Sequence, residues 1–236
     1  MTPAPDQNLI ERLKRYDTPT ICNAVEVAQG KRGFTGFTHR TMEWSGLPEQ
    51  RIVGYARTAH IAGRSPSDDA PEVARQRRMA YFRSMADGPR PGLAVIEDVD
   101  GAAALGAWWG EIHAQVHSRV FGLYGAVTNG VMRDLGDLPD DFPVLAGATG
   151  PSHGFVHVRA IGEPVEIFGM TVREGDLIHA DRHGAVSIPL DVLKKLPTAL
   201  DTLSKAEAII LDPLKAGPVS FETFETLWAE FEKART

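Results

Sequence analysis

Two short segments carry groups that can bind a small anion and a metal ion. The first is Gly110-Glu111, where the sequence predicts that a helix begins, and the second is the pair Arg133-Asp134. A helix N-terminus attracts anions through its free amide groups. An arginine binds a carboxylate through two hydrogen bonds, and an adjacent aspartate can hold a hard divalent cation. Together these features suit a small keto acid, whereas an Arg-Asp pair alone is more typical of solvated surface charges.

The residues around these segments indicate the elements that must position them. A turn is expected at 108–111, followed by a helix, an apolar strand at 123–127 and a tight turn at 128–130. Upstream, residues 92–99 form a continuous apolar run, typical of a strand buried on both faces. This run ends in the carboxylates Glu97, Asp98 and Asp100. Such a strand end is one place where α/β proteins gather ligands, although loop carboxylates of this kind are common.

The remaining patterns predict a mixed α/β chain. Helices are expected at 8–16, 20–29 and 71–85, and strands at 51–62, 143–146, 156–158, 164–168 and several short segments between 169 and 189. A one-turn helix is expected just after Asp134. The end of the chain is helical at 190–211, is broken by Pro213, Gly217 and Pro218, and closes with an amphipathic helix at 221–233.

Bulk composition excludes several classes of function. The chain has 236 residues and a formal net charge of -6, so a general nucleic-acid footprint or an anionic membrane surface is not expected. Its single cysteine, Cys22, excludes an internal disulfide and fits a reducing cytoplasm. No apolar run approaches the roughly 20 residues that a membrane span needs.

The two segments also resemble a family signature. The family holding the class II 4-hydroxy-4-methyl-2-oxoglutarate aldolases and the regulator of ribonuclease activity A carries an acidic residue after a Gly, then a spacer, then Gly-x-x-Arg-Asp. Here these are Gly110-Glu111 and Gly130-Val131-Met132-Arg133-Asp134, with a spacer one residue longer near Val120-Phe121-Gly122. Strand residues Gly54, Ala56 and Thr58, and the Phe142-Pro143-Val144 order, extend the resemblance from Asp17 to Pro189.

This resemblance implies a fold and an assembly. The fold would be a β/β/α swivelling domain, an α/β fold with a helical N-terminal segment, over residues 1–189. A helical C-terminal arm, residues 190–236, would pack on that domain or on a neighbouring subunit. The assembly would be a homotrimer or homohexamer with sites between subunits, each completed by a carboxylate from a neighbour's C-terminal helix. Glu207 is the best match for that carboxylate.

Aldol cleavage of a 2-oxo acid forms a pyruvate enolate, whose charge is stabilised by a Schiff-base lysine or a metal. The lysines lie mostly in the terminal helices, which favours the metal route. We therefore expect Mg²⁺ or Mn²⁺ as cofactor, with Asp134 as a metal ligand, and Arg133, Asp134 and Glu111 as catalytic residues. The resemblance implies Glu207 as the further metal ligand. The expected contacts of a small 2-oxo-acid substrate are Gly110, Glu111, Ile112, His113, Arg133 and His153. The same enolate forms when oxaloacetate loses carbon dioxide, so a decarboxylase side activity is expected.

Other charged residues have alternative interpretations. The helix at 71–85 carries Arg75, Arg77, Arg78 and Arg83, which indicate a solvated face or an oligomer contact more readily than an anion patch. His179 and His183 have the spacing of a helical metal site, but strand and turn residues surround them, so hydrogen-bonded roles are favoured. The rival function is a non-enzymatic regulator that binds a ribonuclease or another partner, and Arg133-Asp134 does not separate it from an aldolase.

Overall fold

The computed structural model describes residues 7–235, which form two compact units. One unit holds the chain up to Thr18 together with Gly36–Ile188, and the other holds Pro19–Thr35 together with the chain from Pro189. The first unit contains both segments of the motif, so its sheets and helices position the site. The domain boundaries inferred from the resemblance stay a prediction.

The first unit is built on one large mixed sheet, with β2 (Ile52–Ala62) near its centre. Parallel strands β3 (Gly92–Asp98), β5 (Leu123–Thr128) and β7 (Val144–Ala146) follow on one side of β2. The antiparallel strands at its margins are β1 (Glu43–Trp44), β9 (His157–Ile161), β12 (Leu177–Asp181) and β13 (Gly184–Ile188). The long strands lie where the apolar runs predicted them, because each run can be buried in a sheet covered on both faces.

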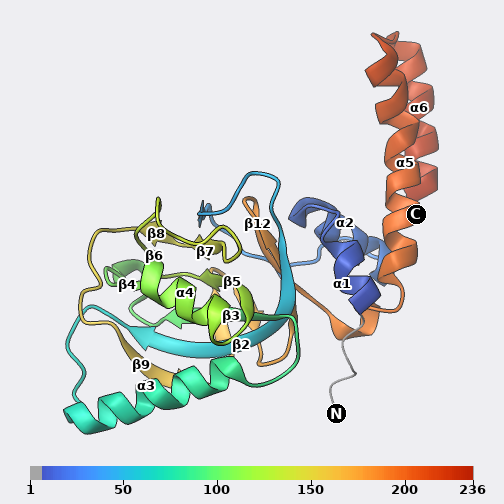
Figure 1. Ribbon diagram of the computed structural model, residues 1–236. Coiled ribbons are helices and arrows are strands. Elements are labelled where there is room, and N and C mark those ends of the chain that lie inside the picture. Colours follow the sequence, from blue (N-terminus) through green and yellow to red (C-terminus); the bar gives the residue numbers. More distant parts are fainter. Residues whose placement is uncertain (1–6, 236) are drawn as a thin grey trace. The chain divides into compact units, whose positions relative to one another are not determined.

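Strand β3 shows how the core is divided between the two faces of this sheet. Ala94 and Ile96 belong to one apolar cluster, which helices α3 (Pro71–Ala86) and α4 (Glu111–Arg119) cover. Leu93 and Val95 belong to the other cluster, which the hairpin β10 (Val165–Ile167) and β11 (Met170–Val172) covers. Figure 1 shows α3 and α4 beside this sheet. The alternation follows from the period of two along a strand.

A small three-stranded parallel sheet carries the two segments of the motif. Its strands are β4 (Ala107–Trp109), β6 (Val131–Met132) and β8 (Ala148–Thr149), in the order β4-β6-β8. The prediction of a turn at 108–111 is therefore wrong for Trp108 and Trp109, which lie in β4. Strands this short leave no alternating pattern that sequence analysis can detect, and their pairing is decided by tertiary contacts.

The longer spacer between Glu111 and Arg133 contains a helix-to-strand turn and a bulge. In the turn, Phe121 N–H donates to the Val116 carbonyl at 3.2 Å and Gly122 adopts a φ of 63°. In β5 the register with β3 shifts between Leu123 and Ala126, where Gly125 has a φ of 151°. Both irregularities use glycine at a left-handed φ.

The helices mostly match their predicted positions. Helix α1 (Gln7–Leu13) precedes α2 (Thr18–Gln29), and the short 3-10 helices are η1 (Gly101–Ala103) and η2 (Leu190–Val192). Two expectations are wrong. The segment after Asp134 forms turns rather than a one-turn helix, and α5 (Leu196–Ala216) continues through Pro213 and ends before Gly217, whose φ is 155°. Helix α5 packs along α6 (Phe221–Arg235), so tertiary contacts offset the loss of the hydrogen bond that the proline cannot donate.

Among the described residues, no helix combines the length and apolar character that crossing a membrane requires.

Candidate functional site

Parallel pairing of β4 and β6 brings the two segments of the motif together. Gly110 follows the end of β4 and Arg133 follows the end of β6. The backbone N–H of Arg133 donates to the Trp109 carbonyl at 2.9 Å, which continues the ladder by one bond. Because neighbouring parallel strands end at the same edge of a sheet, the N-terminus of α4 and the Arg133-Asp134 pair share that edge.

Asp134 links the two segments directly. Its Oδ2 accepts a hydrogen bond from the backbone N–H of Glu111 at 3.1 Å and lies 3.5 Å from Nε of Arg133. The carboxylate therefore satisfies one free amide at the start of α4 and is favoured by the helix dipole. Asp134 has a φ of 58°, a left-handed conformation that aspartate tolerates better than most residues and that turns its side chain toward the helix.

Glycine is required at position 110 because a side chain would not fit there, and not because of the backbone conformation. Its φ of -157° is ordinary extended backbone. A Cβ at this position would lie 2.6 Å from Oδ2 of Asp134 and 3.1 Å from Nε of Arg133. Only glycine therefore lets the arginine and the aspartate approach the beginning of α4 this closely.

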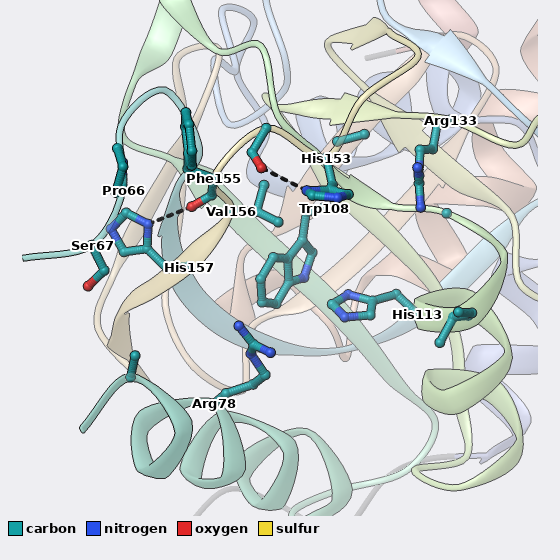
Figure 2. A pocket seen from close by; sticks show the side chains of 15 residues that line it. Pro66, Ser67, Arg78, Trp108, His113, Arg133, His153, Phe155, Val156 and His157 are labelled. Atoms are coloured by element: carbon teal, nitrogen blue, oxygen red, sulfur yellow. Dashed lines mark hydrogen bonds between the residues drawn. The ribbon is translucent and has the colours of Figure 1, made fainter. Parts of the chain in front are cut away.

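A cavity of about 550 Å³ lies beside this edge, and five of the expected substrate-binding residues line it. These are Gly110, Ile112, His113, Arg133 and His153. Figure 2 shows that the cavity is also bordered by Arg78 from α3, Trp108 from β4, and Phe155 and His157 from the segment around the start of β9. Among the described residues, no aspartate or glutamate lines it, so the surroundings favour an anion.

The remaining expected site residues lie outside this cavity. Asp134 lines a hollow of about 400 Å³, which shares Arg133 with the first cavity. The side chain of Glu111 is exposed and lines neither, while its backbone N–H binds Asp134. Glu207 is half-buried on α5, in the other compact unit. The roles expected for these residues stay predictions.

His113 is held neutral in the cavity wall. Burial, together with the nearby charges of Arg78 and Arg133, lowers the pKa of His113 to about 4. Its Nδ1 is buried and has no hydrogen-bond partner among the described residues. At neutral pH, His113 therefore presents an uncharged ring to the cavity, and the permanent positive charges of the wall are those of the two arginines.

Sequence analysis did not identify the buried network behind this wall. Nδ1 of His117 lies 2.6 Å from the His113 carbonyl, which can only accept, so Nδ1 carries the proton. Nε2 of His117 must then accept from the Tyr81 hydroxyl at 2.7 Å, and Nε1–H of Trp108 donates to that hydroxyl at 3.3 Å. Burial lowers the pKa of His117 to about 3. The network fixes Trp108 in place, and the spacing of His113 and His117 on one helical face is the signal that could have revealed it.

The carboxylates at the end of β3 and just after it have separate partners. Glu97 Oε2 accepts from the Glu166 backbone at 2.6 Å, and Asp100 Oδ2 accepts from the Gly63 and Arg64 backbones, each at 2.8 Å. Asp98 Oδ1 accepts from the Asp100 backbone at 3.0 Å, and burial raises the pKa of Asp98 to about 6. Within residues 7–235, no three His, Cys, Asp or Glu side chains form a cluster that could hold a metal ion.

The late histidines have hydrogen-bonded roles. Nε2 of His179 lies 3.0 Å from the Tyr16 carbonyl and Nδ1 lies 3.0 Å from Oγ1 of Thr18. Nδ1 of His183 lies 3.1 Å from Oδ1 of Asp181. His153 and His157 line the cavity, and each donates through Nδ1 to a backbone carbonyl nearby, of Gly154 at 2.7 Å and of Phe155 at 2.8 Å.

Comparison with known proteins places the chain in a family. A family model described as RraA-like, Aldolase/RraA, matches residues 18–187. No curated protein matches the chain significantly. The resemblance inferred from the motif is therefore confirmed at the level of the family.

Solved structures show the same fold at low sequence identity. An uncharacterized protein from Pseudomonas syringae pv. tomato has a TM-score of 0.69 and 19% identity over 100% of both chains. RraAS2 from Streptomyces coelicolor, an unusual member of the RNase ES inhibitor RraA family, has a TM-score of 0.64 and 23% identity over 86% of this chain and 96% of its own. A protein described among novel cellulases from gut-associated microbes has a TM-score of 0.70 and 18% identity, with 89% and 90% covered. These likenesses confirm the α/β fold expected from the sequence.

Proposed function

The chain belongs to the RraA-like family of aldolases and RraA proteins, and from that premise we propose that it is a divalent-metal-dependent aldolase. Its substrate would be a 4-hydroxy-2-oxo acid such as 4-hydroxy-4-methyl-2-oxoglutarate, cleaved to pyruvate. The observation that carries the proposal is the meeting of Arg133, Asp134 and the start of α4 at the edge of a cavity that no described carboxylate lines.

The chain's own groups suit two demands of the cleavage, which are binding of the substrate carboxylate and stabilisation of the enolate charge. When the 4-hydroxyl of the substrate gives its proton to solvent water, the C3–C4 bond breaks, C4 becomes the carbonyl carbon of the second product, and the bonding electron pair passes into the pyruvate enolate. A proton from water then converts the enolate to pyruvate. The guanidinium of Arg133 lines the cavity and would stabilise the negative charge that develops on the keto oxygen. The backbone amides at the start of α4, next to Gly110, would hold the substrate carboxylate. Arg133 is paired with Asp134 at 3.5 Å, but no described carboxylate lines the cavity to compete with the substrate for its guanidinium.

One oxygen of Asp134 is available to a hard cation, which supports the proposal of a metal ion here. Its Oδ2 has partners within the chain, while Oδ1 makes no hydrogen bond or ion pair with any described residue. A Mg²⁺ or Mn²⁺ ion would be held by that oxygen and by waters, since Mg²⁺ commonly keeps several waters beside one or two carboxylates. When bound, such an ion supplies Lewis-acid stabilisation of the oxygen that becomes negative. A trimeric or hexameric assembly, in which Glu207 of the partner subunit completes the site, belongs to the proposal.

The proposal is tested by measuring pyruvate release from 4-hydroxy-4-methyl-2-oxoglutarate and from oxaloacetate, each with Mg²⁺ and with EDTA. We expect turnover of both, because both pass through the same enolate, and loss of turnover in EDTA and in Asp134→Asn. Arg119→Met is the matched control, since Arg119 forms an exposed ion pair with Asp141 and lines neither the cavity nor the hollow. Turnover that Asp134→Asn leaves intact would contradict the assignment.

Absence of turnover in folded protein would refute the aldolase proposal for these substrates. Calorimetry with Mg²⁺ then separates two explanations. Binding of Mg²⁺ without turnover directs attention to another keto acid, whereas a chain that neither binds Mg²⁺ nor turns over either substrate is better explained as a regulator. In that second case, binding to a ribonuclease in a pull-down is the next measurement.

A further inference from the structure

The cavity is positively lined although the chain as a whole is acidic. The sequence has 31 acidic and 25 basic residues apart from histidine. Among the described residues, the charged and titratable side chains that line the cavity are Arg78, Arg133, His113, His153 and His157. Arg133 is paired with Asp134, which lies outside this wall, whereas no described carboxylate pairs with Arg78, so the positive charge of Arg78 is available to a ligand anion.

Arg78 differs from the other arginines of α3 in where its side chain lies. Arg77 is tied to Asp69, with Nη1 2.6 Å from Oδ2. Arg75 and Arg83 are exposed, as Arg78 is, but they do not line the cavity. Arg78 makes no hydrogen bond or ion pair with any described residue, although it lines the cavity. Its five N–H donors therefore remain available to a ligand.

The two arginines border the cavity from different elements. Arg133 follows β6, while Arg78 is on α3, and Figure 2 shows Trp108 and His113 between them. Burial, together with the positive charges of both arginines, lowers the pKa of His113. The His113 ring is therefore neutral, and the positive charges of Arg78 and Arg133 lie on opposite sides of it.

We propose that Arg78 binds a second carboxylate of the substrate, so that the cavity selects 2-oxo acids with an anionic group at the far end from the keto acid. This inference rests on the proposed function, because it takes Arg133 as the residue at the keto-acid end. The volume of about 550 Å³ lies within the roughly 300 to 1,000 Å³ that is usual for small-molecule sites. Guanidinium forks are suited to carboxylates because they offer two parallel hydrogen bonds.

The proposal is tested with two ligands that differ only at the far end. 2-Oxoglutarate ends in a carboxylate, and 2-oxopentanoate has the same chain length and ends in a methyl group. Their affinities for the full chain are measured by calorimetry in the presence of Mg²⁺. We expect the wild type to prefer 2-oxoglutarate, and Arg78→Met to reduce that preference by about tenfold, as for the loss of one charge-assisted hydrogen bond at an open site.

Two further variants keep this test specific. Arg75→Met removes an exposed arginine one helical turn away and is expected to leave the preference unchanged. Arg78→Lys keeps the charge but loses the fork, and is expected to retain part of the preference. A wild type without a preference, or an Arg78→Met variant that weakens both ligands equally or neither, would overturn the proposal.

The binding readout separates this inference from the proposed function. If 2-oxoglutarate binds in an Arg78-dependent way but no substrate is cleaved, the far-end site stands and the aldolase assignment fails. If both substrates are cleaved and the ligand preference does not depend on Arg78, the aldolase assignment stands and this inference fails.

Discussion

Replacing Gly110 by alanine tests whether close approach at the start of α4 builds the site. The added Cβ would lie 2.6 Å from Oδ2 of Asp134, and an ordinary contact begins near 3.4 Å, so the carboxylate or the helix must move by about 0.8 Å. Such a shift would stretch the 3.1 Å bond from the Glu111 amide beyond hydrogen-bond length and would move Arg133, whose Nε lies 3.1 Å from the same Cβ position.

The expected effect is larger on activity than on stability. Overpacking of this kind costs about 1 to 3 kcal/mol of unfolding free energy. A misplacement of about 1 Å in a catalytic group can lower the rate by roughly 100-fold, so kcat/KM for pyruvate release should fall by roughly 10- to 100-fold. Denaturant unfolding and steady-state pyruvate release measure the two effects on the same protein.

Gly136→Ala is the matched control for this substitution. It lies in the turns just after Asp134, its φ is not in the left-handed region, and nothing lies within 4 Å of the Cβ it would gain. We expect wild-type kcat/KM and equal or slightly greater stability, since alanine restricts the unfolded chain. A Gly110→Ala variant with the kcat/KM of the wild type would refute the reasoning that glycine is required for space.

Two further predictions concern the buried groups. Tyr81→Phe removes the hydroxyl that joins Trp108 to His117 and leaves Nε2 of His117 unpartnered, so unfolding free energy should fall by about 1 to 3 kcal/mol, while the half-exposed Tyr124→Phe changes little. If Tyr81→Phe unfolds at the wild-type denaturant midpoint, the network is not structural. Acid should also destabilise the fold, because burial lowers the pKa values of His113, His117 and His179 to about 4, 3 and 4, below the unfolded value near 6.5. The unfolded chain therefore binds more protons, and the stability that is present above pH 6.5 is lost as pH falls toward 4, by roughly 2 to 5 kcal/mol between pH 6.5 and 5. Asp98, with its pKa raised to about 6, acts in the opposite direction over the same range but is one group against three. Denaturant unfolding at a series of pH values measures how the unfolding free energy depends on pH. An unfolding free energy that increases as pH falls from 6.5 to 5 would contradict the prediction.

Several elements could be predicted because their signal is local. The apolar run that became β3 predicted burial on both faces, and Ala94 and Leu93 do lie in opposite clusters. The Gly110-Glu111 segment predicted the start of α4, because helix starts depend on a few adjacent residues, whereas the strands β4 and β6 that end at the two segments were not predicted. Pro213 shows the limit of such signals, since α5 continues through it where α6 packs alongside.

By itself, the sequence determined the residue types of the motif, the longer strands and helices, and the family to which the chain belongs. Only the tertiary structure decided which of these residues meet. The pairing of β4 with β6 places Arg133 and Asp134 at the start of α4, and strands of two or three residues carry no pattern that predicts a partner. Likewise, Arg78 and His157 join the cavity wall, and Tyr81 meets His117, across separations that no sequence period spans. Local preferences set the elements, while contacts between distant residues, which depend on packing the whole unit, set the site.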